Sequence, residues 1–199
     1  CQIPYAQPDT PIQSYTISTA HEAGWTWDIG LAERRGVGYV YSGNHTSDDR
    51  AETVLRGYLG DDGQTASTRV ISFRAGYREH QWVKNCVAIG LSAGFFEPLE
   101  STGMVLIEIA VGMLAELYNG GGPMDGAAAR FNYLMKARCE RITDFIKLHY
   151  CLSKRDEAFW RDNKAASSIP DTLGNMLDMW KYRPPNRFDF LSDLESFSY

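Results

Sequence analysis

The chain has 199 residues, of which 44% are hydrophobic, 23% charged and 13% aromatic, and its formal net charge is -5. This composition is typical of one folded globular domain with a sizeable core and argues against extended disorder. The acidic balance, without a cluster of Lys and Arg, argues against a nucleic-acid partner. No apolar run is long enough for a membrane span and no signal peptide begins the chain, so we expect a cytoplasmic protein without a membrane partner.

The cysteines and histidines show no spacing that indicates a metal site or a disulfide framework. The four cysteines contain no C-x-x-C pair, which favours free thiols, and the four histidines share no metal-ligand spacing. We therefore expect no metal. The chain starts at Cys1 and stops at Tyr199 without a polar tail, and both ends look cut.

The first eighty residues carry strand signals followed by one helix. Aromatic and β-branched residues alternate with polar ones over residues 14–42, on either side of Glu33-Arg34-Arg35-Gly36, which predicts an antiparallel hairpin. A capping-box pattern at residues 46–49 predicts a helix that ends at Gly60. A further strand is expected over Arg69 to Phe73.

The segment from Trp82 to Gly103 is the most informative part of the chain. It predicts a buried strand over residues 86–89, a glycine-rich turn, an extended stretch at Pro98, and a helix with Ser101 or Thr102 as its N-cap. The first-turn amides near Thr102 and Gly103 would then form an anion site. By spacing alone, Glu100 is more simply a carboxylate that stabilises the helix N-terminus.

Two long helices are expected after this segment. Apolar residues recur at helical spacing after Gly103 until the stop at residues 119–123, and again over residues 125–151. The pattern becomes irregular from residue 167, and residues 183–186 read as a surface loop. The whole order indicates an α+β fold with a sheet region (1–80), a strand-turn-helix region (81–119) and a helical region (120–199).

Three other patterns compete with this interpretation. Gly90-Leu91-Ser92-Ala93-Gly94 matches the G-x-S-x-G nucleophile elbow, but the helix that should follow the serine at once is delayed to beyond Pro98. A dinucleotide loop starting at Gly36 fails at its third glycine position, which is Tyr41. Trp25 and Trp27 share one strand face, which ordinarily means packing against a sheet.

The residues resemble the FAD-dependent halogenases of the tryptophan halogenase type. Gly24-Trp25-Thr26-Trp27-Asp28-Ile29 is similar to the W-x-W-x-I-P signature of that family, and Phe96-Glu97-Pro98-Leu99-Glu100-Ser101-Thr102-Gly103 to its flavin-side segment. The helix around Asp144 to Tyr150 also resembles a later family helix. Two independent motifs at the right separation make the likeness specific, and it covers most of the chain.

The resemblance implies a part of a larger α/β flavoprotein of the FAD-dependent monooxygenase kind. It implies that reduced FAD from a separate, transient flavin reductase, with oxygen and chloride or bromide, yields a hypohalous acid that reaches tryptophan or another small electron-rich aromatic. Thr102 and Gly103 would bind the halide, and Glu100 would be catalytic. Trp25 and Trp27 would separate flavin from substrate, and the cofactor-binding residues would be Gly90, Pro98, Leu99 and Ser101. A homodimer is left open.

Departures from the family pattern qualify these expectations. Gly30 stands where the signature has proline, and the family's glycine loop and essential lysine have no counterpart here. We therefore expect an interior fragment of a halogenase that is inactive alone. The alternatives are a flavoprotein monooxygenase without halide use, a serine hydrolase built on Ser92, and a non-catalytic remnant.

Overall fold

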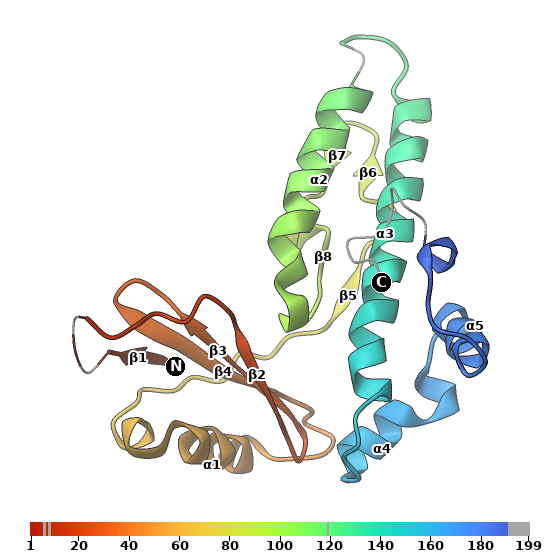
Figure 1. Cartoon of the computed structure of the whole chain (residues 1–199). Coiled ribbons are helices and arrows are strands. Elements are labelled where there is room, and N and C mark those ends of the chain that lie inside the picture. Colours follow the sequence, from red (N-terminus) through yellow and green to blue (C-terminus); the bar gives the residue numbers. More distant parts are fainter. Residues whose placement is uncertain (6, 8, 119, 191–199) are drawn as a thin grey trace. The chain divides into compact units, whose positions relative to one another are not determined.

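The computed structural model describes residues 1–190 except 6, 8 and 119 (Figure 1). The chain forms two compact units. We call Cys1–Phe73 with Ser153–Asn163 the sheet unit, and Arg74–Leu152 with the residues from Lys164 onwards the helical unit. The division of the chain at residues 80 and 119 stays a prediction, but the expected α+β class is confirmed.

The sheet unit contains a four-stranded antiparallel sheet in the order β1-β4-β3-β2. Its strands are β1 (Gln2–Pro4), β2 (Ile17–His21), β3 (Gly24–Gly30) and β4 (Arg34–Tyr41). The predicted hairpin is confirmed, but its turn is shorter than expected. Leu31 N–H donates to Arg34 O at 2.8 Å. Arg35 and Gly36, which the sequence predicts in the turn, already belong to β4 and pair with Gly30 and Ile29 of β3.

Helix α1 (Asp48–Leu59) supplies the main packing partner of the sheet, and α4 (Ala158–Lys164) also lies in this unit. The Ser47 hydroxyl accepts from Arg50 N–H, so the N-cap of α1 lies within the predicted segment 46–49. Gly60 ends the helix at a φ of 63°, as predicted. The 3₁₀-helix η1 (Gly60–Gln64) follows. Ile3, Val37, Leu55 and Leu59 form the buried cluster between helix and sheet.

The tryptophan pair is part of the packing of this sheet. Trp25 is opposite Val40 and Trp27 is opposite Gly38. A Cβ atom at Gly38 would lie 2.5 Å from the Trp27 ring, so the indole covers the backbone of β4 where only glycine leaves room. Trp25 is 4% exposed. The rings therefore have a structural role within the sheet, whatever further role they have.

The strand expected over residues 69–73 does not form. Val70, Ile71 and Phe73 are all exposed, and the segment runs as irregular chain. β-branched residues favour a strand only where another strand supplies the ladder hydrogen bonds, and that partner is set by tertiary structure.

Two long helices dominate the helical unit and run side by side (Figure 1). They are α2 (Thr102–Leu117) and α3 (Asp125–Cys151), and both match the predicted ranges closely. Shorter elements surround them: β5 (Gly76–Tyr77), β6 (Trp82–Val83), β7 (Cys86–Val87), η2 (Gly90–Ser92), β8 (Gly94–Phe95), η3 (Leu99–Ser101), η4 (Ala166–Ser168), α5 (Asp171–Trp180) and η5 (Arg187–Asp189). Residues 183–186 form a loop, as expected.

The strand predicted over residues 86–89 is wrong in length and burial. β7 has only two residues, pairs with β6 in a tight hairpin, and leaves Cys86 exposed. The apolar run is divided between this hairpin and the pocket described below, where Ile89 is found. A short apolar run does not by itself distinguish a buried strand from pieces of irregular chain that line a cavity.

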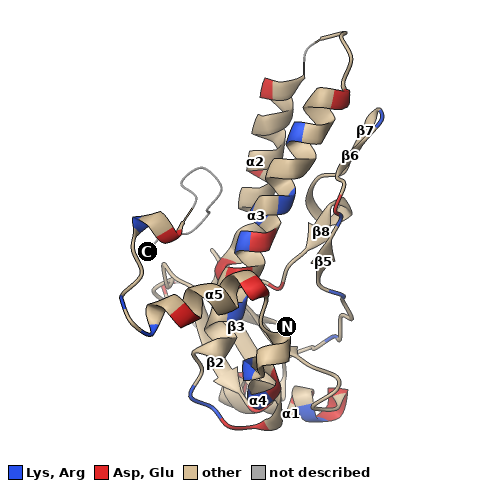
Figure 2. Ribbon diagram, turned by 90° about the vertical axis from the view of Figure 1, so that its right-hand side faces the viewer, with Lys and Arg blue, Asp and Glu red and all other residues tan. Residues whose placement is uncertain are grey.

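One asparagine fixes the β6 segment to α3. The Asn132 carboxamide oxygen accepts from Gln81 N–H and Trp82 N–H, both at 2.8 Å, and its Nδ2 donates to Trp82 O at 2.8 Å. Trp82 then packs into a cluster with Ala110 of α2 and with Phe131 and Met135 of α3. Charged residues are sparse on α2 compared with α3, which agrees with the apolar contacts of α2 (Figure 2).

Within the described part of the chain, no helix is long and apolar enough to cross a membrane. The four cysteines are free thiols, as the spacing predicts. No group of three His, Cys, Asp or Glu side chains gathers as a metal site among the described residues.

The Trp27–Gly38 contact can be tested by substitution in the complete protein. Gly38→Ala should lower the free energy of unfolding by about 1–3 kcal/mol, because the new methyl group overlaps the indole and the core must shift. Gly43→Ala is the matched control, since a Cβ there meets nothing within 4 Å. Chemical denaturation measures both, and equal stabilities for the two variants would contradict the close contact.

Candidate functional site

The turn that joins β8 to α2 has an unusual backbone. Glu100 has a φ of 66° and Ser101 a φ of 53°, so two consecutive non-glycine residues are left-handed. Each such residue costs about 1–3 kcal/mol and persists only where the surroundings hold it. Ser101 N–H donates to Pro98 O at 3.1 Å and closes the turn. Backbone strain therefore falls on the residue that the family likeness makes catalytic.

Helix α2 begins directly after this turn, and its first turn has backbone amides and a buried hydroxyl that are available to a ligand. Ser101 is its N-cap, as predicted, but its hydroxyl caps none of the first-turn amides. The first four N–H groups of a helix have no intrahelical partner. Thr102 is 2% exposed, and its Oγ1 atom has no hydrogen-bond partner among the residues that the structure describes. A Cβ at Gly103 would meet nothing within 4 Å. This helix start offers donors and space to an anion.

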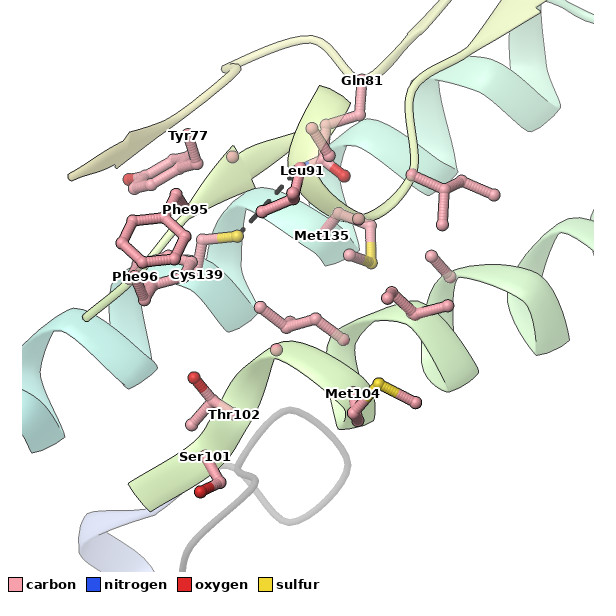
Figure 3. A pocket seen from close by; sticks show the side chains of 18 of the residues that line it. Tyr77, Gln81, Leu91, Phe95, Phe96, Ser101, Thr102, Met104, Met135 and Cys139 are labelled. Atoms are coloured by element: carbon pink, nitrogen blue, oxygen red, sulfur yellow. Dashed lines mark hydrogen bonds between the residues drawn. The ribbon is translucent and has the colours of Figure 1, made fainter. Parts of the chain in front are cut away.

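A pocket of about 430 Å³ opens beside the start of α2 (Figure 3). We call it the α2 pocket. Its walls are mainly apolar, with the aromatic rings of Tyr77, Phe95 and Phe96 on one side and α2 on another (Figure 3). It brings together five residues that sequence reasoning singled out: Gly90, Pro98, Ser101, Thr102 and Gly103. Leu99 and Glu100 are not among its lining residues.

Gly90 has a structural reason for being glycine. Its φ of 63° is left-handed, and a Cβ there would lie 3.3 Å from Ile107 of α2. The glycine thus lets the η2 turn approach the helix and closes one side of the pocket.

Gln81 is a pocket residue that the sequence analysis missed. It is 3% exposed, and its Nε2 lies 3.8 Å from Cys139 Sγ (Figure 3). Within the described part of the chain, its Oε1 atom has no hydrogen-bond partner. Burial raises the pKa of the Cys139 thiol to about 11, so the thiol stays protonated at neutral pH. No sequence signal indicates this role, because Gln81 follows the polar run Arg78-Glu79-His80, which is typical of a surface segment. The pocket thus contains two buried oxygens that a ligand could satisfy, on Gln81 and Thr102.

Glu100 lies in a different setting on the outer side of the same turn. Its Oε1 is 3.1 Å from His149 Nε2 near the end of α3, and both side chains are about one-third exposed. The next residue of α3, Tyr150, donates its hydroxyl to Glu97 Oε2 at 2.7 Å. Two adjacent residues of α3 therefore hold the two carboxylates of the turn.

Ser92 has the geometry of a turn residue. Its hydroxyl donates to Ile89 O at 2.8 Å and accepts from Ile89 N–H at 3.0 Å. Asp144, which a hydrolase would need, instead accepts from the Thr172 hydroxyl at 2.7 Å and pairs with Arg141. His149 contacts Glu100 instead. These partners disfavour a hydrolytic triad.

Trp25, Trp27 and Gly30 all belong to the sheet unit. A Cβ at Gly30 would lie 2.9 Å from Ile12 Cγ2 and 3.2 Å from Gln13 O. The close approach of residues 12–13 explains glycine at this position, where the signature has proline. The departure therefore has a packing explanation and does not point to a different chemistry.

Residues 2–197 match the protein family described as Tryptophan halogenase. The chain belongs to this family. Tryptophan 6-halogenase SttH of Streptomyces toxytricini is 36% identical over 202 residues, which cover 100% of this chain and 38% of that protein. Tryptophan 7-halogenase RebH of Lentzea aerocolonigenes is 34% identical, over 90% of this chain and 34% of its own length.

Solved structures of this halogenase family have the same fold. A tryptophan halogenase from Shewanella frigidimarina matches with a TM-score of 0.93 and 42% identity, over 99% of this chain and 38% of that chain. BrvH, a flavin-dependent halogenase from Brevundimonas sp. BAL3, matches with a TM-score of 0.86 and 38% identity, over 98% and 39%. The chain thus spans well under half the length of these relatives.

The α2 pocket has a shape and lining that fit two groups, a halide ion and a flavin ring. A halide suits the helix start, where the Thr102 hydroxyl lacks a partner and Gly103 leaves space. An apolar cavity of about 430 Å³ with aromatic walls suits the planar ring of a flavin. The described residues offer no phosphate loop for the rest of FAD, because Gly36 and Gly38 lie within β4.

The unpartnered Thr102 hydroxyl gives a stability prediction. Without halide, Thr102→Val should raise the free energy of unfolding by about 1 kcal/mol, because a buried unsatisfied oxygen is removed. Thr26→Val is the matched control. Thr26 is also fully buried, but its Oγ1 lies 3.1 Å from His21 Nε2, so that variant should lose about 1–3 kcal/mol. Loss of stability in both variants would show that Thr102 has a partner.

The left-handed turn gives a second prediction. Ser101→Gly should raise the melting temperature of the complete protein by relieving about 1 kcal/mol of backbone strain. Ser101→Ala keeps the Cβ and the strain, and serves as the control. If glycine and alanine stabilise equally, the turn is not strained at this residue.

Proposed function

We propose that the complete protein is a flavin-dependent halogenase that acts on tryptophan or another small electron-rich aromatic. The observation that carries the proposal is the start of α2. A buried, unpartnered threonine hydroxyl and an uncapped helix N-terminus open there into an apolar pocket, within the family segment from Phe96 to Gly103. The 6-halogenase and 7-halogenase relatives support tryptophan as the substrate class.

Each part of the turn has a definite role in this proposal. The α2 amides and the Thr102 hydroxyl hold the halide, and the absence of a side chain at Gly103 lets it approach the backbone. The apolar pocket walls exclude water from the anion, which makes these few donors more effective. Gly90, Pro98 and Ser101, which line the pocket, shape the cofactor side. Leu99 stays a predicted cofactor-binding residue outside that lining. Trp25 and Trp27 stay predicted as the residues that separate flavin from substrate.

Bound reduced FAD would supply two electrons, so that with O₂, a halide ion and one proton the products are FAD, hypohalous acid and water. The hypohalous acid then transfers its halogen to a ring carbon of the substrate, and that carbon loses a proton. Glu100 is the residue predicted to handle this proton. A separate flavin reductase is the expected source of reduced FAD.

The test is an assay of the complete protein with a flavin reductase, NADH, FAD, a halide salt and a panel of indoles, analysed by mass spectrometry. Halogenated product should require reduced FAD, oxygen and halide together. Glu100→Gln should lower the rate by about 10²-fold or more. Thr102→Val should raise the halide concentration needed for half-maximal rate.

Ser92→Ala is the matched control and should still halogenate, because the described contacts of the Ser92 hydroxyl are both with Ile89 of the same turn. Formation of hydroxylated product without halide would contradict the proposal and show that the protein is a monooxygenase. Labelling of Ser92 by a fluorophosphonate probe would replace it with a hydrolase. If Glu100→Gln halogenates at the wild-type rate, Glu100 takes no part in the reaction.

A further inference from the structure

The His149 ring has a defined tautomer because of its contact within α3. Its Nδ1 atom lies 2.9 Å from the carbonyl oxygen of Phe145, one helical turn earlier. A carbonyl oxygen only accepts hydrogen bonds, so the hydrogen must be on Nδ1. A neutral imidazole carries one N–H, and Nε2 is then a bare acceptor.

This tautomer places two acceptors opposite each other. His149 Nε2 lies 3.1 Å from Glu100 Oε1. A bare Nε2 and an ionised carboxylate would both present lone pairs, and the contact would be repulsive. A proton between the two atoms makes it attractive, either as imidazolium with carboxylate or as neutral imidazole with carboxylic acid. One proton shared between the two atoms satisfies this geometry.

The pair is held in place from both sides. On the turn, Glu100 has a left-handed backbone, and the neighbouring Glu97 accepts from Tyr150. On α3, the Phe145 ring contacts the His149 ring edge-to-face with centroids 4.9 Å apart. The contact between Glu100 and His149 therefore joins two fixed elements of the helical unit.

The other ionisable groups near the pair along the chain are Glu97 on the turn and Lys147 and Cys151 on α3. Burial lowers the pKa of the Lys147 ammonium and raises that of the Cys151 thiol. Helix α5 meets α3 one turn earlier, at Asp144, through the Thr172 hydroxyl. Because both members of the pair are partly exposed, the shared proton can exchange with water.

We propose that Glu100 and His149 act as a single proton-holding dyad in which His149, a positioning residue, keeps one proton available on Glu100 during halogenation. This inference rests on the proposed function. It explains how one carboxyl group can both give and take a proton within a turnover.

Glu100, protonated from the dyad, donates its proton to the oxygen of the hypohalous acid as the halogen bonds to the ring carbon, and water leaves with the electron pair of the oxygen–halogen bond. The cationic ring then loses the proton at the halogenated carbon to the Glu100 carboxylate, and the C–H electron pair restores the aromatic ring. Water and the haloarene are formed, and the dyad again holds one proton.

The first experiment needs no turnover. In the complete protein labelled with ¹⁵N-histidine, NMR should show a proton on Nδ1 of His149, whether the ring is neutral or is an imidazolium with Nε2 also protonated. The Nε2 signal should change in Glu100→Gln while that of Nδ1 does not. A neutral ring with its proton on Nε2 would overturn the inference, because Nε2 would then simply donate to the carboxylate and no shared proton would be needed.

The second experiment is the pH profile of halogenation. The wild type should show two limbs, because the active dyad holds one proton and loses activity on gaining or losing another. His149→Gln keeps a side chain able to bond Glu100 but cannot be protonated. The variant should lose the acid limb of the profile. Its rate at neutral pH should be about tenfold or more below that of the wild type, and the difference between the two rates should shrink as the pH falls.

Tyr150→Phe is the matched control, since it removes the neighbouring bond from α3 to the same turn without removing an imidazole. It should keep both limbs of the profile. A uniform loss in His149→Gln at every pH would show a merely structural role and overturn the inference. If the complete protein halogenates nothing, the proposed function fails, and the NMR result decides separately whether the dyad exists.

Discussion

The left-handed pair Glu100–Ser101 is the constraint on which the site depends. It reverses the chain after Pro98 so that α2 starts beside the pocket, with Thr102 buried at its first turn. The same reversal places Glu100 outside the pocket lining and against His149. Thr102 thus lies in an environment that suits an anion, whereas Glu100, two residues earlier, lies in one that suits a proton. An unstrained turn would not separate them in this way.

Helix α3 provides the rigid support for this turn. Near its start, Asn132 makes three hydrogen bonds to the backbone of Gln81 and Trp82, which fixes one wall of the pocket. At its end, His149 and Tyr150 contact the carboxylates of the turn. Because both contacts are made by the same helix, the pocket wall and the proton-holding pair have a fixed position relative to each other. A site on rigid elements loses less entropy when its ligand binds.

Several motifs of the sequence have structural roles that compete with functional ones. Trp27 covers Gly38 in the sheet, and Ser92 caps its own turn. Gly30 makes room for residues 12–13. For Ser92 and Gly30 the local contacts account for the residue completely. For the tryptophans they do not exclude a further role, since an aromatic face that packs on a sheet can still border a cofactor site.

Local patterns predicted most of the secondary structure because its causes are local. The cap at Ser47, the stop at Gly60 and the 3.6-residue periodicity of residues 125–151 act within a few residues of chain, and α1, α2 and α3 follow them. The sequence by itself also determined the family, through the motifs around Trp25 and Glu100. Tertiary structure alone decided that residues 69–73 form no strand, that Gln81 enters the pocket, and that His149 meets Glu100 across 49 residues. These outcomes depend on which distant segments come together rather than on any pattern within one segment. In the helical unit, the packing of α2, α3 and the β6 hairpin sets them.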